Sequence, residues 1–145
     1  MGLPHVIGLI FSMINASRST PEEIALVREK RFRRLLRTAA EKSPFYRDLY
    51  RGIDIEKCRL TDLPIVDKTT MMDHFDDFVT DPCLKKDQII RWIENKDNIG
   101  RMYRGKYIPI RTSGTTGKFA IVVYDRWALD IVQAAMIAQI GRAHV

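Results

Sequence analysis

The sequence predicts an α-rich α/β fold in which several helices come first and a β-hairpin and a closing helix follow. Capping residues and helical spacing of apolar residues dominate the chain up to about residue 95. Two short runs rich in β-branched and aromatic residues, 106–110 and 119–124, flank a loop of small residues, as in a hairpin. An alanine-rich apolar segment over 126–138 then has the spacing of a last helix.

The first segment, residues 1–19, is short and apolar. No lysine or arginine precedes its apolar run at 6–14, whereas a secretory signal normally begins with basic residues. The run is also too short to span a bilayer. We therefore expect residues 1–19 to form a short helix that packs on the domain or a poorly ordered tail, with a signal sequence as the alternative.

Capping residues mark the helix boundaries in the next part of the chain. Thr20 precedes a proline at the first helical position and Glu23 completes a capping box, so a helix should run to about residue 42. Ser43 should then start a short helix through about residue 50. Asp67 should cap one helix through about residue 78, and a further helix should end near Asn95.

The basic residues of the chain, whose net charge is +6, concentrate in the first long helix. They are Arg28, Lys30, Arg31, Arg33, Arg34 and Arg37. Apolar residues at helical spacing, Val27, Phe32, Leu35 and Leu36, should turn another face of this helix toward the core. We therefore expect a solvated basic face, with nucleic-acid binding as the alternative. No zinc-ligand spacing, aromatic RNA-binding pattern or helix-turn-helix signal accompanies the charge.

The most informative segment is the loop between the two predicted strands. It combines small hydroxyl residues, glycines and a lysine in the order Thr112, Ser113, Gly114, Thr115, Thr116, Gly117 and Lys118. Glycines let a phosphate approach backbone N–H groups, hydroxyls donate further hydrogen bonds, and lysine adds a positive charge. The P-loop of ATPases needs Gly-Lys followed by Ser or Thr, but here Phe119 follows Lys118. The sequence predicts a phosphate-binding loop of another kind, with an unliganded glycine-rich turn as the alternative.

This loop resembles the Ser/Thr/Gly-rich signature loop of adenylate-forming enzymes, the acyl-CoA synthetase superfamily. Its Ser-Gly-Thr-Thr-Gly-Lys form is similar to that of the phenylacetate–CoA ligase family, although Lys118 follows Gly117 directly, without the residue that separates them in the general pattern. Upstream, the basic helix, the Ser-Pro-Phe-Tyr segment at 43–46 and the Leu-Pro…Lys segment at 63–68 resemble the same family. The resemblance covers roughly residues 28 to 128.

The resemblance implies a cytoplasmic ligase that uses ATP and Mg²⁺ to join a carboxylic acid to a thiol such as CoA through an acyl-adenylate. It implies that residues 112–118 bind the ATP phosphates and that this chain supplies no catalytic or metal-ligating residue. The expected partner is a small-molecule carboxylic acid, with neither nucleic acid nor membrane, and Cys58 and Cys83 would remain thiols. The alternatives are a non-catalytic nucleotide- or phosphate-binding module and a basic RNA-binding protein.

The length of the chain, 145 residues, is small for such an enzyme. The metal, ribose and catalytic-lysine motifs that the resemblance implies come later in the family. We therefore expect residues 20–139 to be the incomplete N-terminal part of an adenylate-forming domain, inactive alone, whose intact parent has an α/β fold. Residues 140–145 can be back-translated to a common sequencing adapter, so we expect a non-native tail there; the alternative is an ordinary helix end at Gly141.

Overall fold

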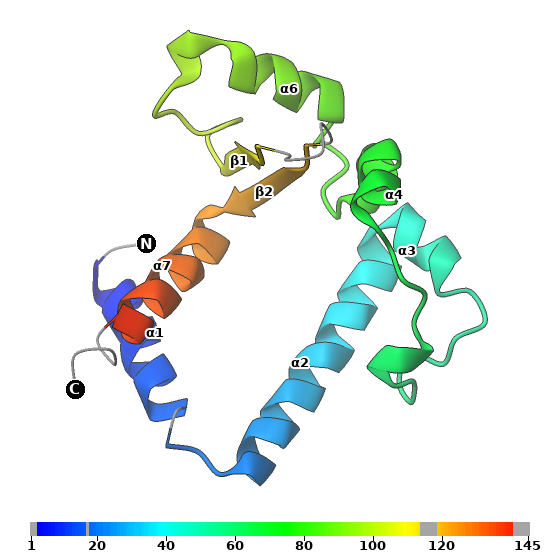
Figure 1. Ribbon diagram of the computed structural model, residues 1–145, viewed down its shortest axis with the longest axis vertical. Helices are drawn as coiled ribbons and strands as arrows, with labels where there is room; N and C mark the ends of the chain where they lie inside the picture. The colour runs from blue at the N-terminus through cyan, green and yellow to red at the C-terminus, as the bar shows by residue number, and fades with distance from the viewer. Residues whose placement is uncertain (1–2, 17, 114–118, 141–145) are drawn as a thin grey trace.

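The computed structural model of the chain describes residues 3–16, 18–113 and 119–140 (Figure 1). These residues are mostly helical and include one small antiparallel sheet, so the predicted α-rich architecture with a hairpin and a closing helix is confirmed. The elements are α1 (Leu3–Ala16), α2 (Pro21–Lys42), α3 (Pro44–Leu49), η1 (Leu60–Asp62), α4 (Lys68–Asp73), α5 (Phe75–Phe78), α6 (Lys86–Glu94), η2 (Lys96–Asn98), β1 (Tyr107–Arg111), β2 (Ile121–Asp125) and α7 (Arg126–Ile140).

The helices and the hairpin form an open frame (Figure 1). α2 makes one side, and α3 packs at its C-terminal end with α5 against it. α6 packs beside the hairpin, and α7 continues directly from β2 to lie alongside α1. No helix in the described residues is long and apolar enough to cross a membrane.

Both ends of α2 have the predicted caps. At its start the Thr20 N–H donates to Glu23 Oε2 at 2.9 Å, and the Glu23 N–H donates to Thr20 Oγ1 at 3.3 Å. This reciprocal pair is a capping box, and it satisfies two donors that the first turn of a helix leaves unpaired. At the other end Ser43 ends α2 and also caps α3, whose first residue is Pro44.

The Ser43 hydroxyl joins three segments at this junction. It is fully buried, accepts a hydrogen bond from the Tyr46 N–H at 3.3 Å, and donates to the Asp77 carbonyl oxygen at 2.9 Å. Aromatic rings close around the same place: Phe78 lies 5.1 Å from Tyr46 and 5.8 Å from Phe45, between ring centroids. The end of α2, the start of α3 and α5 are therefore fastened together.

The single helix predicted over 67–78 is wrong, because the structure has two helices there. α4 ends at Asp73 and α5 begins at Phe75, and His74 between them leaves helical geometry with φ −104° and ψ 20°. Phe75 is buried in the main core, whereas Phe78 packs on the α3 aromatic rings. The break lets the two phenylalanines pack in different clusters. Such tertiary packing routinely overrides the local preference for a continuous helix.

The main core lies between α4, α5, α6 and the hairpin. Its buried residues are Phe75, Leu84, Ile89, Tyr103, Tyr107 and Ile121. Burying a large apolar side chain contributes about 1.5–3 kcal/mol, so this cluster is the main source of stability around the hairpin.

The apolar face of α2 enters a core only in part. Leu36 and Ala39 are its buried residues. Val27 and Leu35 remain 48% and 65% exposed, so the prediction that the whole apolar stripe faces the core is wrong for these two residues.

The hairpin has a defined register. β1 and β2 pair antiparallel from Tyr107 opposite Asp125 to Arg111 opposite Ile121. Before β1, Tyr103 pairs with Tyr107 across a tight turn in which Arg104 and Gly105 have φ of 53° and 67°. Two successive residues with positive φ match the right-handed twist of paired strands, and glycine adopts such a conformation without strain.

Replacing Ser43 with Ala should lower the free energy of unfolding by about 1–3 kcal/mol, because it removes a helix cap and leaves the Asp77 carbonyl oxygen without the donor that the buried Ser43 hydroxyl supplies. Urea denaturation followed by circular dichroism measures this loss. Ser12→Ala is the matched control, because Ser12 is exposed within α1 and should change stability little. Equal effects of the two substitutions would show that the hydrogen bonds of the Ser43 hydroxyl add nothing to the stability of the fold.

Candidate functional site

The predicted phosphate loop joins the two strands of the hairpin. Thr112 and Ser113 follow β1 and are exposed, and Phe119 and Ala120 precede β2. The remaining predicted binding residues lie outside the described part of the chain; they are Gly114, Thr115, Thr116, Gly117 and Lys118.

The base of the loop is closed by two hydrogen bonds between Thr112 and Ala120. The Thr112 N–H donates to the Ala120 carbonyl oxygen, and the Ala120 N–H donates to Thr112 Oγ1, each at 2.9 Å. These bonds continue the strand pairing one step beyond Arg111 and Ile121. A threonine hydroxyl that accepts one bond still has a hydrogen to donate. Thr112 can therefore close the loop and still donate to a ligand.

A second cation, which the sequence reasoning did not count among the binding residues, lies at the loop base. The guanidinium carbon of Arg111 lies 3.9 Å from the centroid of the Phe119 ring, an arrangement typical of a cation–π contact. Arg111 Nη1 also lies 3.6 Å from Glu94 Oε1 at the end of α6. A guanidinium has five N–H donors, so Arg111 can interact with Glu94 and with a further anion. Pairing the two predicted strands around the loop would have placed Arg111 near Phe119.

The first residue of β2 is fixed to α4. The Ile121 N–H donates to Met72 Sδ at 3.3 Å, and the Ile121 side chain is buried in the main core. Lys86 Nζ in turn donates to the Met72 carbonyl oxygen at 2.6 Å. α4 and α6 thus hold the strand that follows the loop, and the loop base has a fixed position relative to the core.

The start of β1 is held by Asp81. The Tyr107 hydroxyl donates to the Asp81 carboxylate, the Cys83 N–H donates to its Oδ1 at 2.9 Å, and Lys106 Nζ lies 3.6 Å from its Oδ2. The hydrogen bond from Tyr107 is the main reason that the pKa of Asp81 falls to about 2. Burial, together with the Asp81 contact, raises the pKa of Tyr107. Both shifts favour a charged carboxylate that accepts a bond from a neutral phenol, so this cluster anchors the hairpin.

Two residues upstream of the loop that belong to the family resemblance lie at helix junctions and not at the loop. Tyr46 belongs to the aromatic junction at Ser43, and Lys68 is the first residue of α4, which Asp67 caps by accepting from the Thr70 N–H at 2.7 Å. Cys58 is buried and Cys83 exposed, and both are free thiols. Within the described ranges, no group of three or more His, Cys, Asp or Glu residues could hold a metal ion.

Comparison with known proteins finds no match to this chain among family models, curated sequences or solved structures.

Asp81→Asn should lower the free energy of unfolding at neutral pH. It should also make that free energy depend less on pH below 4. A carboxyl group whose pKa is lower in the folded state, about 2 against an ordinary 3.8, stabilises the fold above pH 4. That stability is lost as the pH falls from 4 through 2. Because the Asp81 side chain is 30% exposed and water screens it, we expect a loss of about 1 kcal/mol.

Urea denaturation between pH 2 and pH 7 measures the effect of Asp81→Asn. Asp48→Asn provides the matched control, because the ion pair of Asp48 with Arg51 is fully on the surface and should contribute little. If Asp81→Asn and the unmodified chain lose stability in parallel on acidification, the role assigned to Asp81 is wrong.

Proposed function

We propose that this chain is the N-terminal part of an ATP-dependent ligase that activates a carboxylic acid as an acyl-adenylate and passes the acyl group to a thiol. In this proposal residues 112–118 hold the β- and γ-phosphates of ATP. The observation that carries the proposal is the Thr-Ser-Gly-Thr-Thr-Gly-Lys sequence located between two paired strands. The closed base at Thr112 and Ala120 supports it, because a binding loop with fixed ends loses less entropy when it binds.

The surroundings of the loop determine how the phosphate charge would be neutralised. In a P-loop the N-terminus of a helix faces the phosphates, whereas here the segment after the loop is strand β2. The charge must therefore be met by backbone N–H groups, by hydroxyls and by Lys118, with Arg111 at the loop base as a further cation.

The first step assigned to the intact protein is a nucleophilic substitution at phosphorus. A carboxylate oxygen of the acid bonds to the α-phosphorus of ATP while the bond to the bridging oxygen breaks and pyrophosphate leaves. Donors aimed at the β- and γ-phosphates stabilise the charge that develops on the leaving group, which lowers the barrier. The thiol then displaces AMP from the acyl carbon. The proposal gives Mg²⁺ no protein ligand in this chain and makes Lys118 a positioning charge, neither nucleophile nor base.

The proposal is tested first by phosphate binding to the 145-residue chain. Titration with inorganic triphosphate and with MgATP, followed by calorimetry, should detect binding that salt weakens. Lys118→Ala should weaken it by about 1.5–3 kcal/mol, the scale of one charge-assisted contact. Gly114→Val should weaken it further, because a β-branched side chain obstructs the approach of phosphate to the backbone. Lys96→Ala, which removes an exposed lysine from η2, is the matched control.

Activity measurements separate the remaining possibilities. The chain alone should show no acid-dependent exchange of pyrophosphate into ATP, whereas the intact parent should show it, and more weakly with Lys118→Ala. If the chain does not bind triphosphate, or if Lys118→Ala and Lys96→Ala behave alike, the loop is a turn without a ligand. Phosphate binding without exchange by the parent would instead identify a non-catalytic phosphate-binding module.

A further inference from the structure

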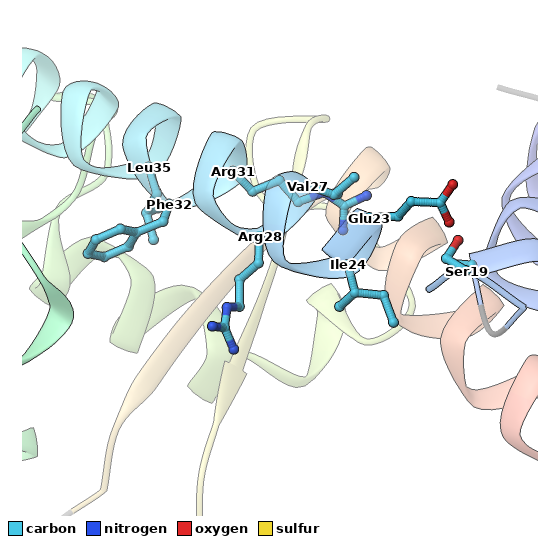
Figure 2. Close-up of a pocket in the computed structure, with 9 residues that line it drawn as sticks. Ser19, Glu23, Ile24, Val27, Arg28, Arg31, Phe32 and Leu35 are labelled. Carbon is cyan, nitrogen blue, oxygen red and sulfur yellow. The ribbon is translucent and has the colours of Figure 1, made fainter. Parts of the chain in front are cut away.

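An apolar groove runs along α2 from its first turn to Leu35 (Figure 2). Its volume is about 520 Å³. The residues that line it are Ala16, Ser19, Glu23, Ile24, Val27, Arg28, Arg31, Phe32 and Leu35. The α2 side chains among them follow one side of the helix over successive turns (Figure 2).

The apolar residues of this groove are unpacked. Ile24 is 50% exposed, Val27 48% and Leu35 65%. The buried residues of α2, Leu36 and Ala39, both lie in its C-terminal half, where α3 packs. Because helices in proteins are stabilised mainly by packing of an apolar face, the apolar residues of α2 from Ile24 to Leu35 contribute less to its stability than they would if they were packed.

Two arginine side chains, Arg28 and Arg31, line the groove. Among the described residues Arg28 and Arg31 form no ion pair, and neither does Arg34 one turn beyond Arg31. In contrast, Arg33 lies 2.6 Å from Glu29, and Arg37 lies 2.5 Å from Glu56. Within the described part of the chain, the arginines of α2 that contact residues 55–58 are thus paired, while those at the groove are not.

We propose that this groove binds an amphipathic helix of a partner protein whose apolar stripe is flanked by Glu and Asp. Ile24 and Leu35 are eleven residues apart, about 17 Å along the helix, so the groove accommodates about three helical turns. Acidic residues on the partner would meet Arg28 and Arg31. A partner running antiparallel to α2 would place its C-terminal turn, where lysine and arginine are favoured, beside Glu23. The proposal uses none of the residues assigned to the phosphate loop.

The charges argue against two other occupants. In a second copy of the chain, the antiparallel register that packs Ile24 on Leu35 would place Arg28 opposite Arg31 twice, and like charges face to face are unfavourable. A helix that lies on a membrane has an apolar face free of charge. In α2, Arg31 stands between Ile24 and Leu35 on the same side of the helix, so that condition is not met.

The test uses a designed acidic peptide, helical and about five turns long, with leucine every third or fourth residue and glutamate on both flanks. Fluorescence anisotropy of the labelled peptide measures its binding to the complete chain. A scrambled peptide of the same composition and a peptide with lysine in place of glutamate are the ligand controls. Arg31→Glu is compared with Lys30→Glu, which makes the same change of charge at the neighbouring position, outside the groove lining.

We expect the acidic peptide to bind the unmodified chain and Lys30→Glu alike, and Arg31→Glu at least about tenfold more weakly, as for a lost charge pair. The lysine peptide should bind Arg31→Glu more tightly than it binds the unmodified chain. Circular dichroism checks that each variant is folded. Equal losses in both variants, or equal binding of the scrambled peptide, would overturn the proposal. Self-association of the unmodified chain that Lys30→Glu leaves intact and Arg31→Glu alters, or Arg31-dependent binding to phosphatidylglycerol vesicles without peptide binding, would overturn it in favour of a second copy or a membrane.

Discussion

Burial of Ile121, the first residue of β2, is the contact on which the arrangement around the loop depends. Its side chain lies in the cluster that joins α5, α6 and the hairpin, and its N–H donates to Met72 of α4. Ala120 and Thr112, which close the loop, come directly before Ile121 and directly after its strand partner Arg111. The base of the loop is therefore positioned by the hydrophobic core, and its own short polar sequence need not supply that stability.

The two halves of the frame differ in how they are held together. Around the hairpin, buried tyrosines and a charged carboxylate at Asp81 combine apolar packing with hydrogen bonds. Along the first turns of α2, apolar side chains are exposed, and so are arginines that form no ion pair with any described residue. Because local opening requires least free energy where few apolar contacts are buried, the N-terminal half of α2 should open most easily. Binding residues are commonly drawn from such regions.

Local signals predicted much of this fold, because capping and turn chemistry act between near neighbours. Thr20 and Ser43 mark helix boundaries where the sequence placed them, and the strands flank the loop as predicted. The break at His74 was not predictable in this way, since it depends on which clusters Phe75 and Phe78 join. The contact of Arg111 with Phe119 could have been predicted by pairing the two strands, whereas its contact with Glu94 depends on the docking of α6.

Because Ser43 caps both α2 and α3, α2 is joined rigidly to the next helix. α2 is 22 residues long, about 33 Å, and no linker separates it from α3. Its other end leads to α1, which lies against α7, and α7 continues from β2 (Figure 1). A rotation of α2 by about 10° at Ser43 would displace its far end by about 6 Å. The angle of α2 at Ser43 therefore determines the distance across the open frame. A change in that angle would require movement at the contacts of α2 with its neighbours.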